Sequence, residues 1–175
     1  MNWRLAAWAP LALLAGCATV QPPHEETWNE QLSGRLAVHV DAHDGVAARN
    51  VNASFDLRGD ARHGELLLST PLGTVLARAR WSPGEVVLKS SDGEKRFANL
   101  AGLSEAVLGE AVPLDALFDW LHGRPWAGAP HRTGSDGGFE QLGWSIDLAR
   151  RAEGSIQARR IEPPAVTVRA RLDTP

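Results

Sequence analysis

The sequence has no tyrosine, a single cysteine among its 175 residues, and no hydrophobic run long enough to cross a membrane. A single cysteine cannot form a disulfide within the chain. The N-terminal apolar stretch, residues 5–15, is interrupted by Pro10 and is too short to span a bilayer as a stable helix. The basic side chains do not cluster, and the formal net charge is −3, so we expect no nucleic-acid partner.

Recognisable catalytic motifs are also absent. The sequence contains no Gly-x-Ser-x-Gly elbow, no His-Glu-x-x-His and no P-loop, and its six histidines are scattered without metal-ligand spacing. Asp115 and Asp119 are four residues apart, opposite a stripe of leucines, and we interpret them as a solvated helix face rather than a catalytic pair. We therefore expect that the protein is not an enzyme and that it has no metal and no dissociable cofactor.

The N-terminus resembles a bacterial lipoprotein signal. A short segment with one positive charge precedes the apolar stretch, which ends in Leu14-Ala15-Gly16-Cys17. In such signals the cysteine thiol receives a diacylglycerol group, the signal is cut before the cysteine, and the new amine is acylated. The resemblance implies lipidation at Cys17, with the alternative of an ordinary secretory signal that ends in a cysteine by chance. Ala18 stands where an aspartate favours inner-membrane retention in enterobacteria, so we expect the outer membrane.

Three regions follow from this interpretation. Residues 1–16 are predicted to be the signal peptide, residues 17–24 the acylated cysteine and a tether containing Pro22-Pro23, and residues 25–175 a single domain. Several acyl chains are sufficient to hold a protein on a bilayer, since each buried methylene contributes about 0.8 kcal/mol.

Alternating apolar residues predict a mainly antiparallel sheet. The pattern runs through residues 34–40, 51–57, 64–70, 74–81, 86–88, 139–148, 155–161 and 166–172, separated by turn residues. Residues 25–32 are predicted to form a short helix and residues 123–138 a loop. We expect eight or more strands with one helix pair inserted.

The helix pair is predicted from apolar residues at helical spacing. The first helix carries Leu100, Leu103, Val107 and Leu108 on one stripe. Pro113 opens the second at its first position. The apolar face of the second helix consists of Leu114, Leu117, Phe118 and Leu121, with Trp120 at its edge.

A predicted hairpin places a leucine where the chain turns. Strand-like residues 66–70 and 74–80 flank Pro71, Leu72 and Gly73, and a proline with a glycine supplies the backbone angles of a turn. Turn tips are normally polar and solvated. Leu72 therefore either folds back onto its own core or contacts a lipid or a partner.

Seven tryptophans are the other distinctive feature, of which two lie in the predicted signal. Core filling explains such residues in general. The alternative is that some of them line an apolar cavity.

Short segments in a fixed order resemble the LolB family of outer-membrane lipoprotein receptors. They cover nearly the whole chain after the signal, and the most specific is Val112-Pro113-Leu114-Asp115-Ala116-Leu117-Phe118-Asp119-Trp120-Leu121-His122-Gly123-Arg124-Pro125. The others are the lipobox, Trp28 ahead of Gly34-Arg35, residues 66–73 with their Pro-Leu-Gly loop, residues 83–88, and Gly143-Trp144 with the final strand. The chain departs from the family pattern at Leu57, where a tryptophan is common, and near its C-terminus, which lacks one.

The resemblance implies an incomplete antiparallel β-barrel, or half-barrel, with a helical lid and an apolar cavity for acyl chains. It implies that the protein accepts acylated lipoproteins from the periplasmic carrier LolA and inserts them into the outer membrane, where it is held on the periplasmic face. Pro71, Leu72 and Gly73 would form the membrane-insertion loop, and we expect a monomer. The acyl cavity and lid would involve Trp28, Leu114, Leu117, Phe118, Trp120, Leu121 and Trp144.

Two other functions remain open at this point. A structural lipoprotein could use the Leu72 loop as a protein contact within an envelope assembly. A periplasmic lipid-modifying enzyme is disfavoured by the missing catalytic motifs.

Overall fold

The computed structural model describes residue 28, residues 30–134 and residues 137–173. The predicted signal peptide and the tether with Cys17 lie outside the described residues. Two α-helices and eleven strands are present in the described part. In chain order they are β1 (Gln31–Val40), β2 (Arg49–Gly59), β3 (Gly64–Ser69), β4 (Val75–Ser82), β5 (Glu85–Ser90), β6 (Gly93–Phe97), α1 (Leu100–Leu108), α2 (Leu114–Leu121), β7 (His131–Thr133), β8 (Phe139–Gln141), β9 (Trp144–Asp147), β10 (Ser155–Arg160) and β11 (Val166–Leu172).

All eleven strands form one antiparallel sheet in the order β6-β5-β4-β3-β2-β1-β11-β10-β9-β8-β7. The first six strands meander outward from β1, and the last five meander outward from β11. The two halves join where β1 pairs with β11, from Gly34 opposite Leu172 to Val40 opposite Val166. Since β6 and β7 stand at opposite edges and do not pair, the sheet is open and not closed into a barrel.

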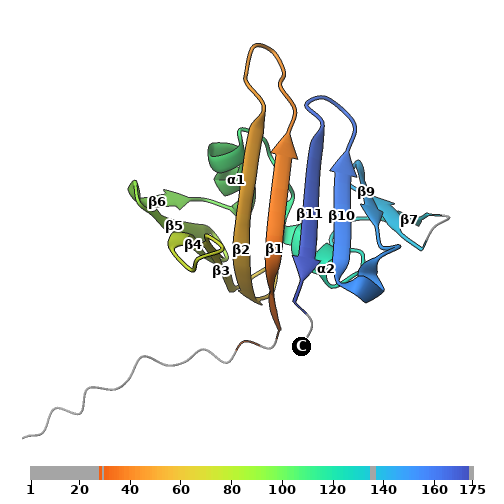
Figure 1. Ribbon diagram of the computed structural model, residues 1–175, viewed down its shortest axis with the longest axis horizontal. Helices are drawn as coiled ribbons and strands as arrows, with labels where there is room; N and C mark the ends of the chain where they lie inside the picture. The colour runs from red at the N-terminus through yellow and green to blue at the C-terminus, as the bar shows by residue number, and fades with distance from the viewer. Residues whose placement is uncertain (1–27, 29, 135–136, 174–175) are drawn as a thin grey trace, which may run out of the picture.

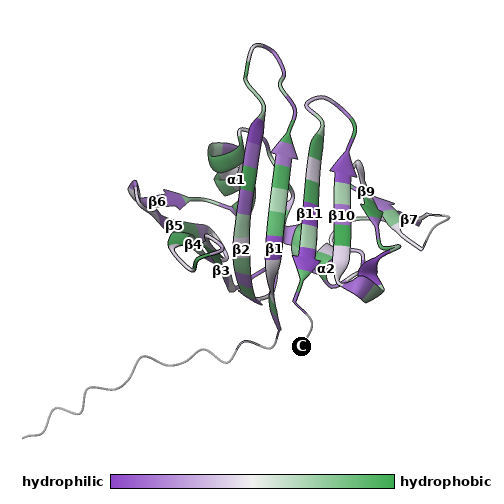
Figure 2. Cartoon of the chain, in the orientation of Figure 1, coloured by the Kyte–Doolittle hydropathy of each residue, from purple (hydrophilic) through white to green (hydrophobic). Residues whose placement is uncertain are grey.

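Both helices lie on one side of this sheet, behind the central strands in the view of Figure 1. Apolar and polar residues alternate along the central strands, as the colouring in Figure 2 shows. In β2, for example, Ala53, Phe55 and Leu57 are buried while Asn52 and Arg58 are exposed. The main core therefore lies between the helix-covered face and the helices.

Close strand pairing at the centre requires a glycine. A side-chain carbon on Gly34 would stand 2.2 Å from the carbonyl oxygen of Arg171 on β11, far inside van der Waals contact. Gly34 therefore allows β1 to pair closely with β11 because it has no Cβ.

Three predictions of local structure are wrong. Gln31 and Leu32, expected at the end of a helix, belong to β1, because they pair with Arg58 and Leu57 of β2. The predicted strand of residues 139–148 is a hairpin of β8 and β9. The predicted loop of residues 123–138 contains β7, which pairs with β8.

Candidate functional site

The tip between β3 and β4 is a tight turn that projects a leucine into solvent. The amide of Gly73 donates to the carbonyl of Thr70 at 2.9 Å, and the amide of Thr74 donates to the Thr70 hydroxyl at 3.1 Å. Gly73 has φ of 86°, which glycine adopts without strain. Leu72 is 95% exposed, and Val75 and Leu76 next to it are also exposed. Leu72 therefore does not fold back onto its own core, and the tip forms a small apolar patch.

An apolar pocket of about 430 Å³ lies between the helices and the facing side of the sheet. Leucine, valine, alanine and aromatic side chains make up most of its lining. From the sheet, these include Leu36, Phe55, Leu57, Leu66, Leu68, Ala77, Ala79, Trp81 and Leu88. From α1, they include Leu100, Leu103, Val107 and Leu108.

The residues predicted on α2 lie where the sequence analysis expected an apolar surface. Leu114, Leu117, Phe118 and Leu121 all line the pocket. The α1 residues were not among the predicted site residues, although their helical spacing was recognised in the sequence. Two apolar helix faces beside one sheet generally face the same interior. The sequence therefore also supports a prediction that the apolar stripe of α1 lines the pocket.

The polar residues of the lining gather on the β5–β6 hairpin. Ser90, Asp92 and Lys95 contribute to the pocket from this hairpin, and Ser104 contributes from α1. Ser104 is 2% exposed and is satisfied by Val112, whose amide donates to its hydroxyl at 2.9 Å. Asp92 and Lys95 are exposed, so they mark an edge where the pocket meets solvent.

The predicted tryptophans stand apart from this pocket. Trp120 is fully buried, and the centroids of the Trp120 and Trp144 rings are 5.9 Å apart. Neither tryptophan lines the pocket. Trp144 instead borders a second cleft, formed by β7–β10. Trp28 is half-buried ahead of β1, with its ring against Gly59, and it does not line the pocket either.

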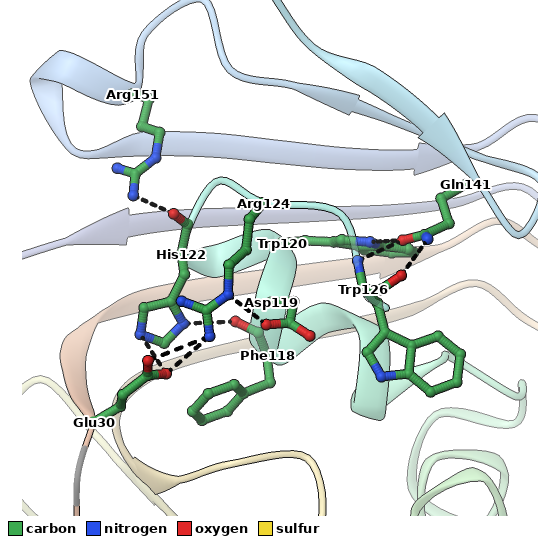
Figure 3. Close-up of polar contacts among 9 residues, drawn as sticks. All are labelled: Glu30, Phe118, Asp119, Trp120, His122, Arg124, Trp126, Gln141 and Arg151. Atoms are coloured by element: carbon green, nitrogen blue, oxygen red, sulfur yellow. Dashed lines mark hydrogen bonds and ion pairs between the residues drawn. The ribbon is translucent and has the colours of Figure 1, made fainter. Parts of the chain in front are cut away.

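A glutamine holds Trp120 in place, as Figure 3 shows. Gln141 is 2% exposed, and its Oε1 accepts from Trp120 Nε1 at 2.8 Å and from the amide of Trp126 at 2.9 Å. Its Nε2 donates to the carbonyls of Trp126 and Ala129, each at 2.7 Å. Sequence reasoning missed Gln141, because its partners come from segments that are apart in the chain.

Charged residues fasten the C-terminal end of α2 to the chain that enters β1 (Figure 3). Arg124 Nε lies 2.7 Å from Asp119 Oδ1, and its Nη2 lies 3.0 Å from Glu30 Oε2. His122 places Nε2 3.3 Å from the same Glu30 oxygen and Nδ1 2.9 Å from the carbonyl of Phe118. Arg151 also donates to the carbonyl of His122.

The two aspartates of α2 are not the solvated face that the sequence analysis expected. Asp119 is ion-paired with Arg124, with its side chain only 18% exposed. Burial raises the pKa of Asp115, whose side chain is half-buried at the start of the helix. The reason is that α2 is embedded between the sheet, α1 and the segment after Gly123, which leaves little of its surface in water.

The described residues contain no helix that is long and apolar enough to cross a membrane. They also contain no group of three or more His, Cys, Asp or Glu side chains that could hold a metal ion. What the fold and the site define is a mainly β protein with an apolar pocket between one sheet face and two helices, and an exposed apolar hairpin tip.

The chain belongs to the LolB family: the family model described as "Outer membrane lipoprotein LolB" matches residues 27–172. A relative from Bordetella petrii named outer-membrane lipoprotein LolB is 35% identical, over 92% of this chain and 88% of its own length. Relatives of the same name from Bordetella pertussis and Chromobacterium violaceum are 38% and 32% identical, over 80% and 86% of this chain. These two matches cover 74% and 84% of the relatives' own lengths.

Membership of this family confirms the resemblance found in the sequence. The protein is an outer-membrane lipoprotein and not an enzyme. The roles of the individual site residues do not follow from family membership and are treated as proposals below.

Proposed function

We propose that this protein accepts acylated lipoproteins from the periplasmic carrier LolA and inserts them into the outer membrane. The observation that carries the proposal is the apolar pocket between the helices and the sheet. Acyl chains are costly to expose to water, at about 0.8 kcal/mol for each methylene, and the pocket offers them an apolar lining.

In this proposal α2 is part of a movable lid. Leu114, Leu117, Phe118 and Leu121 cover one side of the pocket and would lie against the acyl chains. Trp120 and Trp144 would support the lid from the packed interior, because their rings lie beside each other and outside the pocket lining. Trp28 would brace the chain that enters β1 against Gly59.

The anchor and the tip would act on the membrane side. Cys17, which lies outside the described residues, is proposed to be the lipidated residue. The tip at Pro71, Leu72 and Gly73 would contact the bilayer during insertion, since Leu72 packs against little of its own protein. The rival function, a scaffold that uses the same tip as a protein contact, shares this surface but has no use for the pocket.

A substitution that narrows the pocket and leaves Pro71, Leu72 and Gly73 unchanged tests this proposal. Ala77 lines the pocket from β4, so Ala77→Phe should fill part of it. Ala37 lies on β1, where it alternates with the pocket-lining residues Leu36 and Val38, and Ala37→Phe is the matched control. The measured quantity is the transfer of a lipoprotein from LolA to the anchored protein.

We expect Ala77→Phe to reduce this transfer about tenfold and Ala37→Phe to leave it unchanged. Circular dichroism and thermal melting establish that both variants fold. Unchanged transfer in a folded Ala77→Phe variant would contradict the proposal and favour the scaffold.

A further inference from the structure

The polar edge of the pocket contains one acid and one base on the same short hairpin. Asp92 lies in the turn between β5 and β6, and Lys95 lies on β6 directly opposite Leu88 of β5. Residues opposite each other in an antiparallel pair share a face of the sheet. Lys95 therefore stands on the pocket side, next to an apolar lining residue.

The other basic residues of this hairpin, unlike Lys95, form ion pairs with carboxylates. Lys89 lies 3.0 Å from Glu94, and Arg96 pairs with both Glu85 and Glu94. These residues alternate with Leu88 and Lys95, so they occupy the opposite face. Among the described residues, no carboxylate lies within ion-pair distance of Lys95, and no base lies within that distance of Asp92.

The size of the pocket limits what it can hold in this conformation. A methylene group is close in size to a water molecule, whose share of liquid volume is about 30 Å³. A pocket of about 430 Å³ therefore has room for about fourteen methylenes, which is roughly one long acyl chain. A lipid with two chains of this length would need about twice that volume.

We infer that the pocket also takes up a single-chain lysophospholipid with a zwitterionic head, whose phosphate meets Lys95 and whose ammonium meets Asp92. The inference rests on the proposed function, because it requires that the pocket binds acyl chains. The chain would occupy the apolar lining, and the head would remain at the exposed edge beside Ser90. An anionic head would satisfy Lys95 but would place a like charge near Asp92, and a fatty acid would offer Asp92 no cation.

The test uses the full, membrane-extracted protein in a fluorinated surfactant that mixes poorly with hydrocarbon chains. An equimolar mixture of three probes with the same acyl chain is added: lysophosphatidylethanolamine, lysophosphatidylglycerol and the free fatty acid. Native mass spectrometry counts the adducts of each. We expect the zwitterionic probe to be retained about fivefold more than either of the others, a preference of the size that exposed charge pairs supply.

Variants locate this preference at the edge of the pocket. Lys95→Gln and Asp92→Asn should each reduce the preference to nearly equal retention. Lys89→Gln removes the same charge from the outer side of the same hairpin and should preserve it. Equal retention of all three heads by the unmodified protein, or an unchanged preference in both edge variants, would overturn the inference.

The remaining outcomes separate this inference from the proposed function. Stronger retention of the anionic probe, lost in Lys95→Gln and enhanced in Asp92→Asn, would overturn the zwitterionic head. If an acylated lipoprotein binds while none of the three probes does, the inference fails and the proposed function stands. If neither binds, both fail.

Discussion

Trp120 donates from its indole nitrogen to Gln141 Oε1 at 2.8 Å, and both side chains are almost completely buried. The same amide also satisfies the backbone of Trp126 and Ala129. One glutamine thus connects α2, the segment after it and β8 by hydrogen bonds. A buried network of this kind is favourable only when each member is satisfied.

Replacing this glutamine should be strongly destabilising. Gln141→Leu would leave the indole N–H and three backbone groups without their partner, and we expect a loss of about 2–4 kcal/mol in the free energy of unfolding. Urea denaturation followed by tryptophan fluorescence measures it. Gln157→Leu, at a half-buried position on β10, is the control and should change the free energy of unfolding by less than about 1 kcal/mol. Similar losses in the two variants would show that the network contributes nothing special.

A second prediction concerns the ion pair between Glu110 and Arg160. Arg160 Nη2 lies 3.0 Å from Glu110 Oε2, and both side chains are only 18% exposed. The pair connects the segment between the two helices to the end of β10. We expect Glu110→Gln to cost about 1–3 kcal/mol, because it leaves a half-buried guanidinium without its carboxylate.

Glu94→Gln provides the comparison for that measurement. Glu94 pairs with Lys89 and Arg96 at an exposed edge, where such pairs contribute little. The urea midpoint of the Glu94→Gln variant should equal that of the unmodified protein. If Glu110→Gln also left the midpoint unchanged, the segment between the helices would not depend on the pair.

The third prediction concerns pH. Burial raises the pKa of Asp115 above its ordinary value of 3.8. The folded state therefore keeps a proton that the unfolded state releases, and Asp115 lowers stability progressively as the pH rises from about 3.8 through the folded-state pKa. Asp115→Asn should raise the thermal midpoint at pH 7 and have no such effect at pH 3.

Asp60 should behave in the opposite way. Backbone amides of His63 and Arg62 donate to its carboxylate and lower its pKa. Its contribution to stability is present above pH 3.8 and is lost as the pH falls through the lowered pKa. Asp60→Asn should therefore lower the midpoint at pH 7. The same sign for both variants at pH 7 would contradict the argument.

Most of the sheet and both helices could be predicted because each depends on a local pattern. Alternation in residues 51–57 and helical spacing in residues 114–121 are properties of the sequence alone, and burial follows from them. For the same reason, helical spacing identifies the apolar face of α2, whose residues line the pocket.

The errors in the predicted local structure arise where distant partners or unusual backbone angles determine the conformation. Gln31 and Leu32 are strand residues only because β2 pairs with them. Leu142 and Gly143 both have positive φ, at 54° and 77°, and form a two-residue hairpin loop between Gln141 and Trp144. Such loops usually carry asparagine, aspartate or glycine at the first position, so a leucine gave no signal of a turn. Likewise, nothing in the spacing of Trp120 indicated that Gln141 would bury it away from the pocket.

The last prediction separates a lipid contact from a protein contact at the hairpin tip. Leu72 is 95% exposed, so transferring it into a bilayer would gain about 1.5–3 kcal/mol, enough to favour a transient contact but not to anchor the protein. In Leu72→Glu a carboxylate would have to lose its hydration to enter the apolar layer. We expect thermal stability and acceptance of lipoprotein from LolA to stay unchanged, and insertion of the lipoprotein into liposomes to fall.

Acceptance and insertion are therefore scored separately, first without liposomes and then by flotation with them. Ile161→Glu is the matched control, because Ile161 is an apolar residue, 70% exposed, in the loop between β10 and β11. It should impair neither step, since the charge is the same and only the position differs. If Leu72→Glu blocks acceptance and spares insertion, the tip is a protein contact and its assignment to the membrane is wrong. Equal loss of insertion in both variants would point to a general charge effect on the approach to the bilayer, and would contradict a specific role for the tip.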